Sequence, residues 1–302
     1  MIERFLFSLL VLLLPAQIAI AADEGTLCFQ RGDSVNVQDL KTGRIRRVAT
    51  GTDPWLSPDG KQIVYTANLK GVQPDRVIKV VDLATGKSKE FKRLAGFIQS
   101  RGQWSPDGRR LALNVFPVNQ PPTNQKNWKV ILLDPDTGEC RRLMDRGKAS
   151  DEFLSSWRVD GQAVLTQDMN KLFENDLNGN ILRTFEVESF MLNSASHFLL
   201  SPDGSTLVFD QMAVSDTTKG EPPIAIFAYD LQQKKLTRLT PKGLNAVSPN
   251  WWHPGREIIF HANNAKALDT PFDLYRLSLA DPKPILVLRN GSDGSVALYP
   301  KK

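Results

Sequence analysis

Short segments in which apolar and polar residues alternate recur along almost the whole chain, and clusters of Pro, Asp, Asn and Gly separate them. Residues 44–48, 62–65 and 77–81 are three such segments, rich in Ile, Val and Tyr. Alternation of this kind, bounded by turn residues, predicts β-strands with one buried face.

A first turn motif follows many of these segments. Its fullest copies read Trp-x-Ser-Pro-Asp-Gly or Trp-Ser-Pro-Asp-Gly, and each precedes a new apolar run. The positions aligned with the proline are residues 58, 106, 159, 202 and 254, at intervals of 43 to 53 residues. Proline sets φ for a turn, Asp accepts hydrogen bonds from nearby backbone N–H groups, and Gly adopts positive φ, so the motif predicts a hairpin.

A second turn motif, Asp-x-x-Thr-Gly in its full form, alternates with the first. It begins at residues 39, 82, 134, 176 and 230, with a degraded copy at 278–281. Each unit therefore contains two hairpins, which is to say four antiparallel strands in about 43 to 53 residues, the size of a propeller blade. One such sheet cannot bury both faces, so the units must pack against one another.

The number of motifs predicts six blades. A weakened sixth copy of the first motif, Ser292-Asp293-Gly294, precedes a last strand near Val296–Tyr299. We expect that strand to complete the blade begun by residues 26–48 and to close the ring, which removes exposed sheet edges. An open solenoid or two sandwiches would leave the split blade without a purpose. The predicted fold is an all-β, six-bladed β-propeller of four-stranded antiparallel blades, closed by its N- and C-terminal segments.

The two motifs together resemble the repeat of the TolB-type β-propellers, over roughly residues 26–300. The resemblance implies a six-bladed ring in a periplasmic protein, often a docking module. The same repeat also builds propellers of prolyl oligopeptidases and of some polysaccharide lyases. TolB carries an α/β domain before its propeller; here the first strand begins four residues after Ala21, so we expect that domain to be absent.

The N-terminus has the pattern of a secretory signal peptide. Arg4 precedes an apolar run over residues 5–14, Pro15 interrupts it, and Ala19-Ile20-Ala21 offers small residues to a signal peptidase. We predict cleavage after Ala21, with 22–302 as a single propeller domain in the periplasm or outside the cell. An uncleaved anchor is the alternative, but the run is short for a bilayer. No later segment has the length of a membrane span, so we expect no stable span after cleavage.

Composition changes this interpretation little. A net charge of +5 on 302 residues, spread without aromatic interleaving, does not predict nucleic-acid binding. Basic clusters at 44–47, 87–93 and 140–142 fall on or beside outer strands, where charge discourages edge pairing. Cys28 and Cys140 should lie two blades apart, so we predict that both are unpaired.

The sequence offers few residues for catalysis. No Gly-x-Ser-x-Gly elbow is present. His197, His253 and His261 are scattered, and residues 176–180 fit the repeated turn better than a calcium loop. We therefore expect no metal or other cofactor. Trp55, Trp104, Trp157 and Trp252 hold a fixed place in the repeat, which favours packing between blades over a ligand platform.

Binding is predicted on one face. In a four-stranded blade both repeated hairpins open on the same side, while the longer connections between second and third strands open on the other. Variable loops on a rigid scaffold commonly carry function. The candidate contacts are polar residues of these loops: Asp75, Arg76, Asn119, Gln120, Lys126, Asn127, Asp216, Lys219, Glu221 and Asn263.

The sequence thus predicts a non-catalytic binding or scaffold protein of the cell envelope. Its partner would be an envelope protein, a peptide or an envelope polymer, including peptidoglycan-associated partners, held at the long-loop face and the channel mouth. The alternative is a propeller enzyme of the lyase or lactonase type, acting on a carbohydrate-like substrate in the channel.

Overall fold

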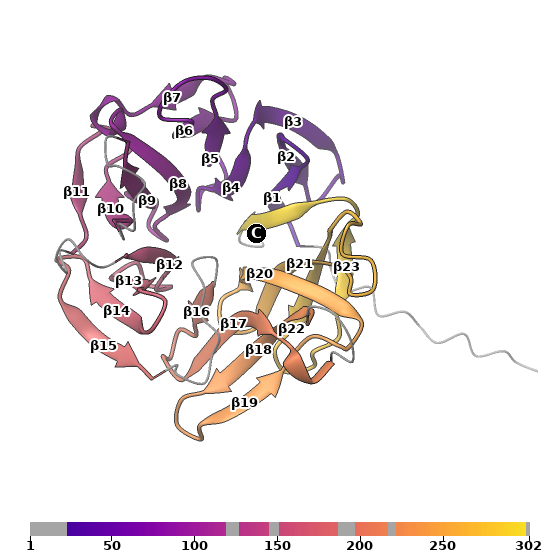
Figure 1. The fold of residues 1–302 in the computed structure, drawn as a ribbon. Coiled ribbons are helices and arrows are strands. Elements are labelled where there is room, and N and C mark those ends of the chain that lie inside the picture. Colours follow the sequence, from indigo (N-terminus) through magenta and orange to yellow (C-terminus); the bar gives the residue numbers. More distant parts are fainter. Residues whose placement is uncertain (1–22, 119–126, 145–150, 187–196, 217–221, 300–302) are drawn as a thin grey trace, which may run out of the picture.

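Six four-stranded antiparallel sheets surround a common axis (Figure 1). The structure is a computed structural model, and it describes residues 23–118, 127–144, 151–186, 197–216 and 222–299. Within these ranges helix is limited to two short 3-10 turns, η1 (Lys92–Leu94) and η2 (Val214–Asp216). The predicted all-β, six-bladed propeller is confirmed. The described part of the chain contains no helix with the length and apolarity to cross a membrane.

Each blade runs from an innermost strand at the axis to an outermost strand at the rim. In that order, the first three blades are β24 (Ser292–Leu298), β1 (Gly25–Arg31), β2 (Ser34–Asp39), β3 (Ile45–Thr50); β4 (Thr52–Leu56), β5 (Gln62–Asn68), β6 (Arg76–Asp82), β7 (Ser88–Glu90); and β8 (Phe97–Trp104), β9 (Leu111–Pro117), β10 (Lys129–Leu133), β11 (Cys140–Arg142). The others are β12 (Phe153–Trp157), β13 (Ala163–Gln167), β14 (Leu172–Asp176), β15 (Ile181–Phe185); β16 (Phe198–Leu200), β17 (Thr206–Met212), β18 (Ile224–Asp230), β19 (Lys235–Arg238); and β20 (Leu244–His253), β21 (Glu257–Asn264), β22 (Asp273–Ser278), β23 (Ile285–Leu288).

The two ends of the chain close the ring as predicted. β24 is the inner strand of the first blade and pairs with β1 from Gly25↔Leu298 to Gln30↔Ser292. A β-carbon on Gly25 would lie 2.4 Å from the carbonyl oxygen of Ala297, so this approach requires glycine. The signal peptide predicted for residues 1–21 lies outside the described residues and stays a prediction.

The repeated turns have the hydrogen bonds that their residue types suggest. In the first motif the hydroxyl of Ser57 donates to Asp59 at 2.6 Å, the backbone N–H of Lys61 donates to the same carboxylate, and Gly60 has φ +71°. In the second motif the N–H of Thr42 donates to Asp39 at 2.8 Å. These local bonds set both hairpins independently of the rest of the ring.

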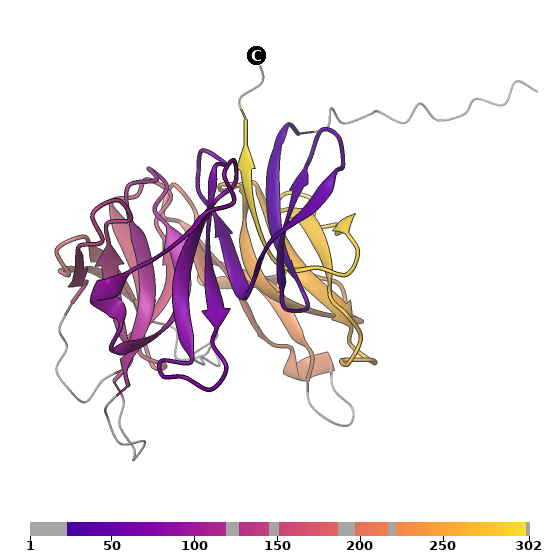
Figure 2. The ribbon, with the colours of Figure 1, turned by 90° about the horizontal axis from the view of Figure 1, so that it is seen from above.

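All repeated hairpins open on one side of the ring, which we call the hairpin face. The connections between second and third strands open on the other side, the loop face. In Figure 2 the end of β24 points to the hairpin face at the top, and η2 lies at the loop face below.

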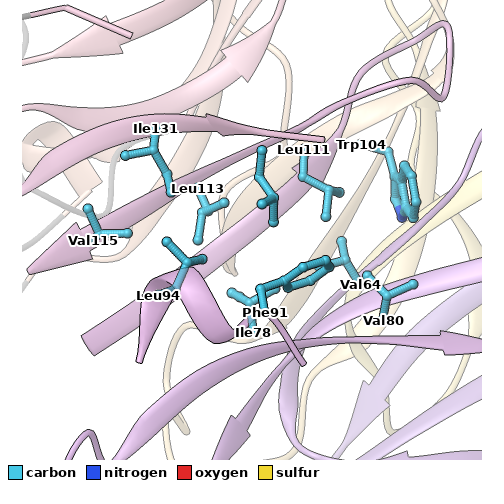
Figure 3. Close-up of a cluster of buried hydrophobic side chains, with 11 residues drawn as sticks. Val64, Ile78, Val80, Phe91, Leu94, Trp104, Leu111, Leu113, Val115 and Ile131 are labelled. Carbon is cyan, nitrogen blue, oxygen red and sulfur yellow. The ribbon is translucent and has the colours of Figure 1, made fainter. Parts of the chain in front are cut away.

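The core consists of side chains held between adjacent blades. Figure 3 shows one such cluster, in which Val64 and Ile78 of the second blade face Leu111 and Leu113 of the third. Each of these four side chains is fully buried, and each contributes about 1.5–3 kcal/mol by leaving water. Trp104 is only 4% exposed in the same cluster. Trp157 and Trp252 are buried in other clusters between blades, and Trp55 packs partly buried against this one. The predicted packing of the repeated tryptophans between blades is thus confirmed.

Side chains of one blade also bond to the backbone of the next. The N–H of Leu56 donates to Ser295 at 2.7 Å, that of Ile78 to Gln99 at 2.9 Å, and that of Leu154 to Asn114 at 2.7 Å. All three bonds are buried. They satisfy buried backbone donors and join three pairs of neighbouring blades.

The two cysteines are unpaired, as predicted. Cys28 lies in the closing blade and Cys140 on the outer strand β11, two blades further round. Burial raises the pKa of the Cys28 thiol to about 12, so it is a neutral packing residue at neutral pH.

Candidate binding channel

Four of the six inner strands contain a bulge of one extra residue at the same place. The pairing register shifts between Thr52 and Trp55 in β4, between Ser100 and Gln103 in β8, and between Val247 and Asn250 in β20. β24 bulges opposite Cys28–Gln30. A bulge bends its strand and redirects a side chain.

At each bulge a residue other than glycine has a left-handed backbone. Asp53, Arg101, Ser248 and Asp293 have φ values of 50°, 55°, 54° and 49°. Such a conformation costs about 1–2 kcal/mol per residue and is typical of functional sites when it recurs. The next residue is Pro or Gly in every case.

These four residues line a small cavity on the axis, together with Gln103 and His197. We call it the chamber. Its volume is about 110 Å³, which is space for a few water molecules or one small functional group. Its walls come from β4, β8, β20, β24 and the residue before β16, so no single blade forms it.

Charges in and around the chamber interact strongly. Burial raises the pKa of Asp53, Asp293 adds to this by repulsion, and Arg101 opposes it. Burial lowers the pKa of Arg101, while Asp53, Asp210 and Asp293 raise it. The guanidinium thus lies among three carboxylates.

Asp210, on β17, lies behind the bulges. Its carboxylate accepts hydrogen bonds from the backbone N–H of Ser248 at 2.9 Å and of His197 at 3.2 Å. Burial raises its pKa, and these two bonds oppose the rise. Asp210 thereby positions two chamber-lining residues.

Two of the three histidines approach the same place. Nδ1 of His261 accepts the backbone N–H of Asp293 at 3.1 Å, and its ring packs edge-on against Phe272. Burial lowers the pKa of His261, and that of His197 falls well below its usual range through burial and the nearby Arg101. Both are therefore neutral at pH 7. His253 is instead paired with Glu257 in a turn, at 2.6 Å.

A wider cavity of about 380 Å³ continues from the chamber toward the hairpin face. Trp55 and Asn250 line both cavities. We call this second cavity the vestibule, and its aromatic wall is Trp55, Trp104, Trp157, Trp251 and Trp252. Exposed turn prolines 58, 106 and 254 form its rim. Trp157 and Trp252 are nearly buried like Trp104, whereas Trp55 and Trp251 are half-buried.

Several buried polar atoms of the channel have no hydrogen-bond partner. They are Oε1 of Gln103 and Nδ1 of His197 in the chamber, and Nε1 of Trp104 and of Trp251 in the vestibule. Buried polar groups are normally paired, and four of the eight unpaired side-chain atoms among the described residues belong to residues that line these two cavities.

The binding residues predicted from the sequence lie elsewhere. Asp75 is exposed and Arg76 half-buried at the loop face, and the Arg76 guanidinium lies over the Trp128 ring. Asn127 is half-buried and lines a groove beside η1. Asn119, Gln120, Lys126, Lys219 and Glu221 lie outside the described residues.

Two further candidates have structural contacts. Asp216 is 6% exposed and paired with Arg238 and Lys242, and the hydrogen bond from Arg238 lowers its pKa. Asn263 is buried, and its amide donates to the carbonyls of Leu268 and Thr270. Asp216 and Asn263 thus stabilise the conformation of connections at the loop face.

Sequence reasoning did not find the chamber. Asp53, Asp210 and Asp293 are far apart in the chain and each resembles a turn or strand residue. A signal was present nonetheless, because Asp53-Pro54, Arg101-Gly102 and Ser248-Pro249 all precede the first turn motif within a few residues. Among the described residues no group of three His, Cys, Asp or Glu side chains is placed to hold a metal ion.

Comparisons with known proteins support the fold. No family model matches this chain. No curated protein matches it either. Among solved structures, TolB from Acinetobacter baumannii is similar at 16% identity with a TM-score of 0.64, over 92% of this chain and 67% of that one.

Two other solved structures are similar. A putative TolB from Agrobacterium tumefaciens has 15% identity and a TM-score of 0.59, over 93% of this chain and 100% of that one. An oligogalacturonate lyase in complex with manganese has 18% identity and a TM-score of 0.53, over 85% and 70%. Identities this low establish architecture rather than activity. The chain therefore has the six-bladed propeller fold found in TolB proteins.

Proposed function

We propose that this protein is an exported, non-catalytic binding protein of the cell envelope, and that a protein or peptide partner enters its central channel. The observation that carries the proposal is the pair of adjacent cavities, chamber and vestibule, whose lining includes four strained residues and residues with unpartnered polar atoms. The TolB-like fold and the predicted signal peptide support an envelope location.

The position of the aromatic wall changes the face on which we expect binding. The vestibule opens at the hairpin face, opposite the long loops first expected to bind. Tryptophan side chains offer large apolar area with a polar N–H, as in many interface hot spots. We propose the hairpin-face mouth as the principal entrance, with Asp75 and Arg76 as secondary contacts at the loop face.

Capture of partners from an envelope extract tests this proposal. Trp55→Ala enlarges the vestibule and removes a half-buried aromatic surface, and we expect it to reduce recovery of a specific partner at least tenfold. The matched variant is Asp75→Ala with Arg76→Ala on the opposite face, expected to have a smaller effect. Thermal unfolding of each variant shows that the ring is intact.

Two outcomes contradict the proposal. Loss of the partner only in the loop-face variant would place recognition on that face. Equal recovery by both variants and the unchanged protein would exclude the channel mouth as the binding site.

A further inference from the structure

We propose that the chamber binds a primary alkylammonium group, the end of a lysine side chain that a partner inserts through the vestibule. This inference rests on the proposed function, because it names the chemistry that the same channel recognises. It is argued from charge, unpartnered acceptors, cavity size and the aromatic wall.

Acidic side chains outnumber basic ones around the chamber. Among the described residues, Asp53 and Asp293 line it together with Arg101, Asp210 lies behind it, and the two nearby histidines are neutral. Burial raises the pKa of Asp53 and of Asp210, which shows that a negative charge is unfavourable there. Burying such charge is unfavourable unless a cation accompanies it, so a cationic ligand is favoured over an anionic one.

Gln103 supplies an independent observation. It is 2% exposed, and its Nε2 donates to the carbonyl of Ser155 at 3.1 Å. That bond orients the amide, and Oε1 is left as a buried acceptor without a donor in a chamber-lining residue. An ammonium group has three N–H donors and no acceptor, which suits an amide oxygen beside carboxylates.

Cavity size restricts the ligand further. About 110 Å³ accommodates an ammonium with its adjoining methylene groups, but not a sugar ring or a folded peptide segment. The longer vestibule would then hold the apolar stem. Lysine is a side chain with such a stem and a compact charged end.

The aromatic wall favours the same ligand. Trp55 lies at the junction of the two cavities, where its ring face would attract a passing ammonium. Trp251 also lines the vestibule and is half-buried, like Trp55. A lysine side chain thus matches the acceptors of the chamber and the aromatic wall of the vestibule.

The binding experiment uses the full propeller labelled with 5-fluorotryptophan and followed by ¹⁹F NMR. The probe is N-acetyl-lysine methylamide, and the matched neutral probe is N-acetyl-norleucine methylamide. We expect the lysine probe to shift the Trp55 resonance at millimolar concentration, with at least fivefold weaker binding of norleucine. Equal binding of the two probes, or no shift by 100 mM lysine probe, would overturn the proposal.

Variants test which residues provide the selectivity. Asp293→Asn should weaken binding of the lysine probe five- to tenfold and leave norleucine unchanged. Arg101→Gln should strengthen it, a gain that misfolding cannot imitate. Asp75→Asn, on the loop face, is the control and should have no effect. Unaltered lysine binding in both chamber variants would contradict the assignment.

The two proposals can fail separately. If Trp55→Ala abolishes partner capture but the lysine probe shows no selectivity, the channel binds a partner of other chemistry. If the probe binds with the expected dependence on Asp293 while Trp55→Ala still captures the partner, the lysine site stands and the proposed route of recognition does not.

Discussion

The two sides of the channel are built differently. On one side β4, β8, β20 and β24 bulge and present left-handed residues to the axis. On the other, β12 has the same one-residue register shift, between Leu154 and Ser156, but without a left-handed residue, and β16 shows no register shift over its three residues. The first side carries Asp53, Arg101 and Asp293, and Asp210 of β17 lies on the second side, where the described inner-strand residues include none with a left-handed backbone.

The regular side joins its blades tightly. Ser155 accepts the N–H of Phe198 at 2.7 Å, and Ser156 donates to the carbonyl of the same residue at 2.6 Å. Trp157 donates through its indole to the carbonyl of Gln103 at 3.1 Å. Three consecutive side chains of β12 thus bond to both neighbouring blades, which makes this strand a structural clamp.

This difference shows how a repeat acquires a site. Equivalent positions on the inner strands pack regularly in one half of the ring. In the other half they adopt a strained, left-handed backbone. Strain of this kind persists only where surrounding structure compensates for it. The tight, hydrogen-bonded half provides such support for the strained half.

The largest expected effect comes from the clamp. Trp157→Ala removes a nearly buried side chain and its indole bond, so we expect about 3–5 kcal/mol lower free energy of unfolding. Trp55→Ala, in the strained half, should lower it by less than half as much because Trp55 is half-buried. Urea unfolding measures both, and equal losses would remove the distinction between the halves.

The strained half should tolerate little added volume. In Gly102→Val a new β-carbon would meet the Val64 side chain at 2.7 Å and that of Ile78 at 3.3 Å. We expect a loss of about 1–3 kcal/mol from overpacking, measured by thermal unfolding. Gly96→Val is the control because nothing lies within 4 Å of its β-carbon; a similar loss in both would contradict a steric cause.

Mild acid should lower the free energy of unfolding through the two buried histidines beside the chamber. The folded-state pKa of His197 and His261 lies below the unfolded value of 6.5, so the folded state binds fewer protons. Their contribution to stability is complete above pH 6.5 and declines as the pH falls below it, by up to about 1.4 kcal/mol per pH unit for each histidine. Unfolding measured between pH 7.5 and 5 should show this slope.

His261→Gln isolates one part of that slope. Glutamine can still accept the Asp293 N–H but does not titrate, so the variant should lose less stability on acidification. A slope identical to that of the unchanged protein would show that His261 does not contribute.

The smallest expected effect is that of Ser248→Gly, which is compared with Ser155→Gly on the other side of the channel. Ser248→Gly relieves a left-handed residue and retains the N–H bond to Asp210, so stability should stay equal or rise by up to about 1 kcal/mol. Ser155→Gly leaves the buried N–H of Phe198 without its acceptor and should lose about 1–3 kcal/mol. Equal losses would argue against strain at Ser248.

The blades could be predicted from sequence because their signals are local. Ser57, Asp59 and Gly60 make a turn whose hydrogen bonds join residues within a few positions. The alternation in 62–65 shows which side chains a strand buries. The number of motifs then predicts six blades, and the weak copy at Ser292 predicts closure, since an unpaired strand edge is unfavourable.

The channel could not be predicted from the sequence, because its residues meet only in the folded ring. Asp53, Asp210 and Asp293 are separated by more than eighty residues at each interval, and no local rule brings them to one axis. Only closure of all six blades sets their mutual distance, burial and charge coupling. Local turn chemistry and strand alternation therefore specify the scaffold, whereas the electrostatics of the site arise from tertiary packing, because burial and Coulomb interaction depend on neighbours in space.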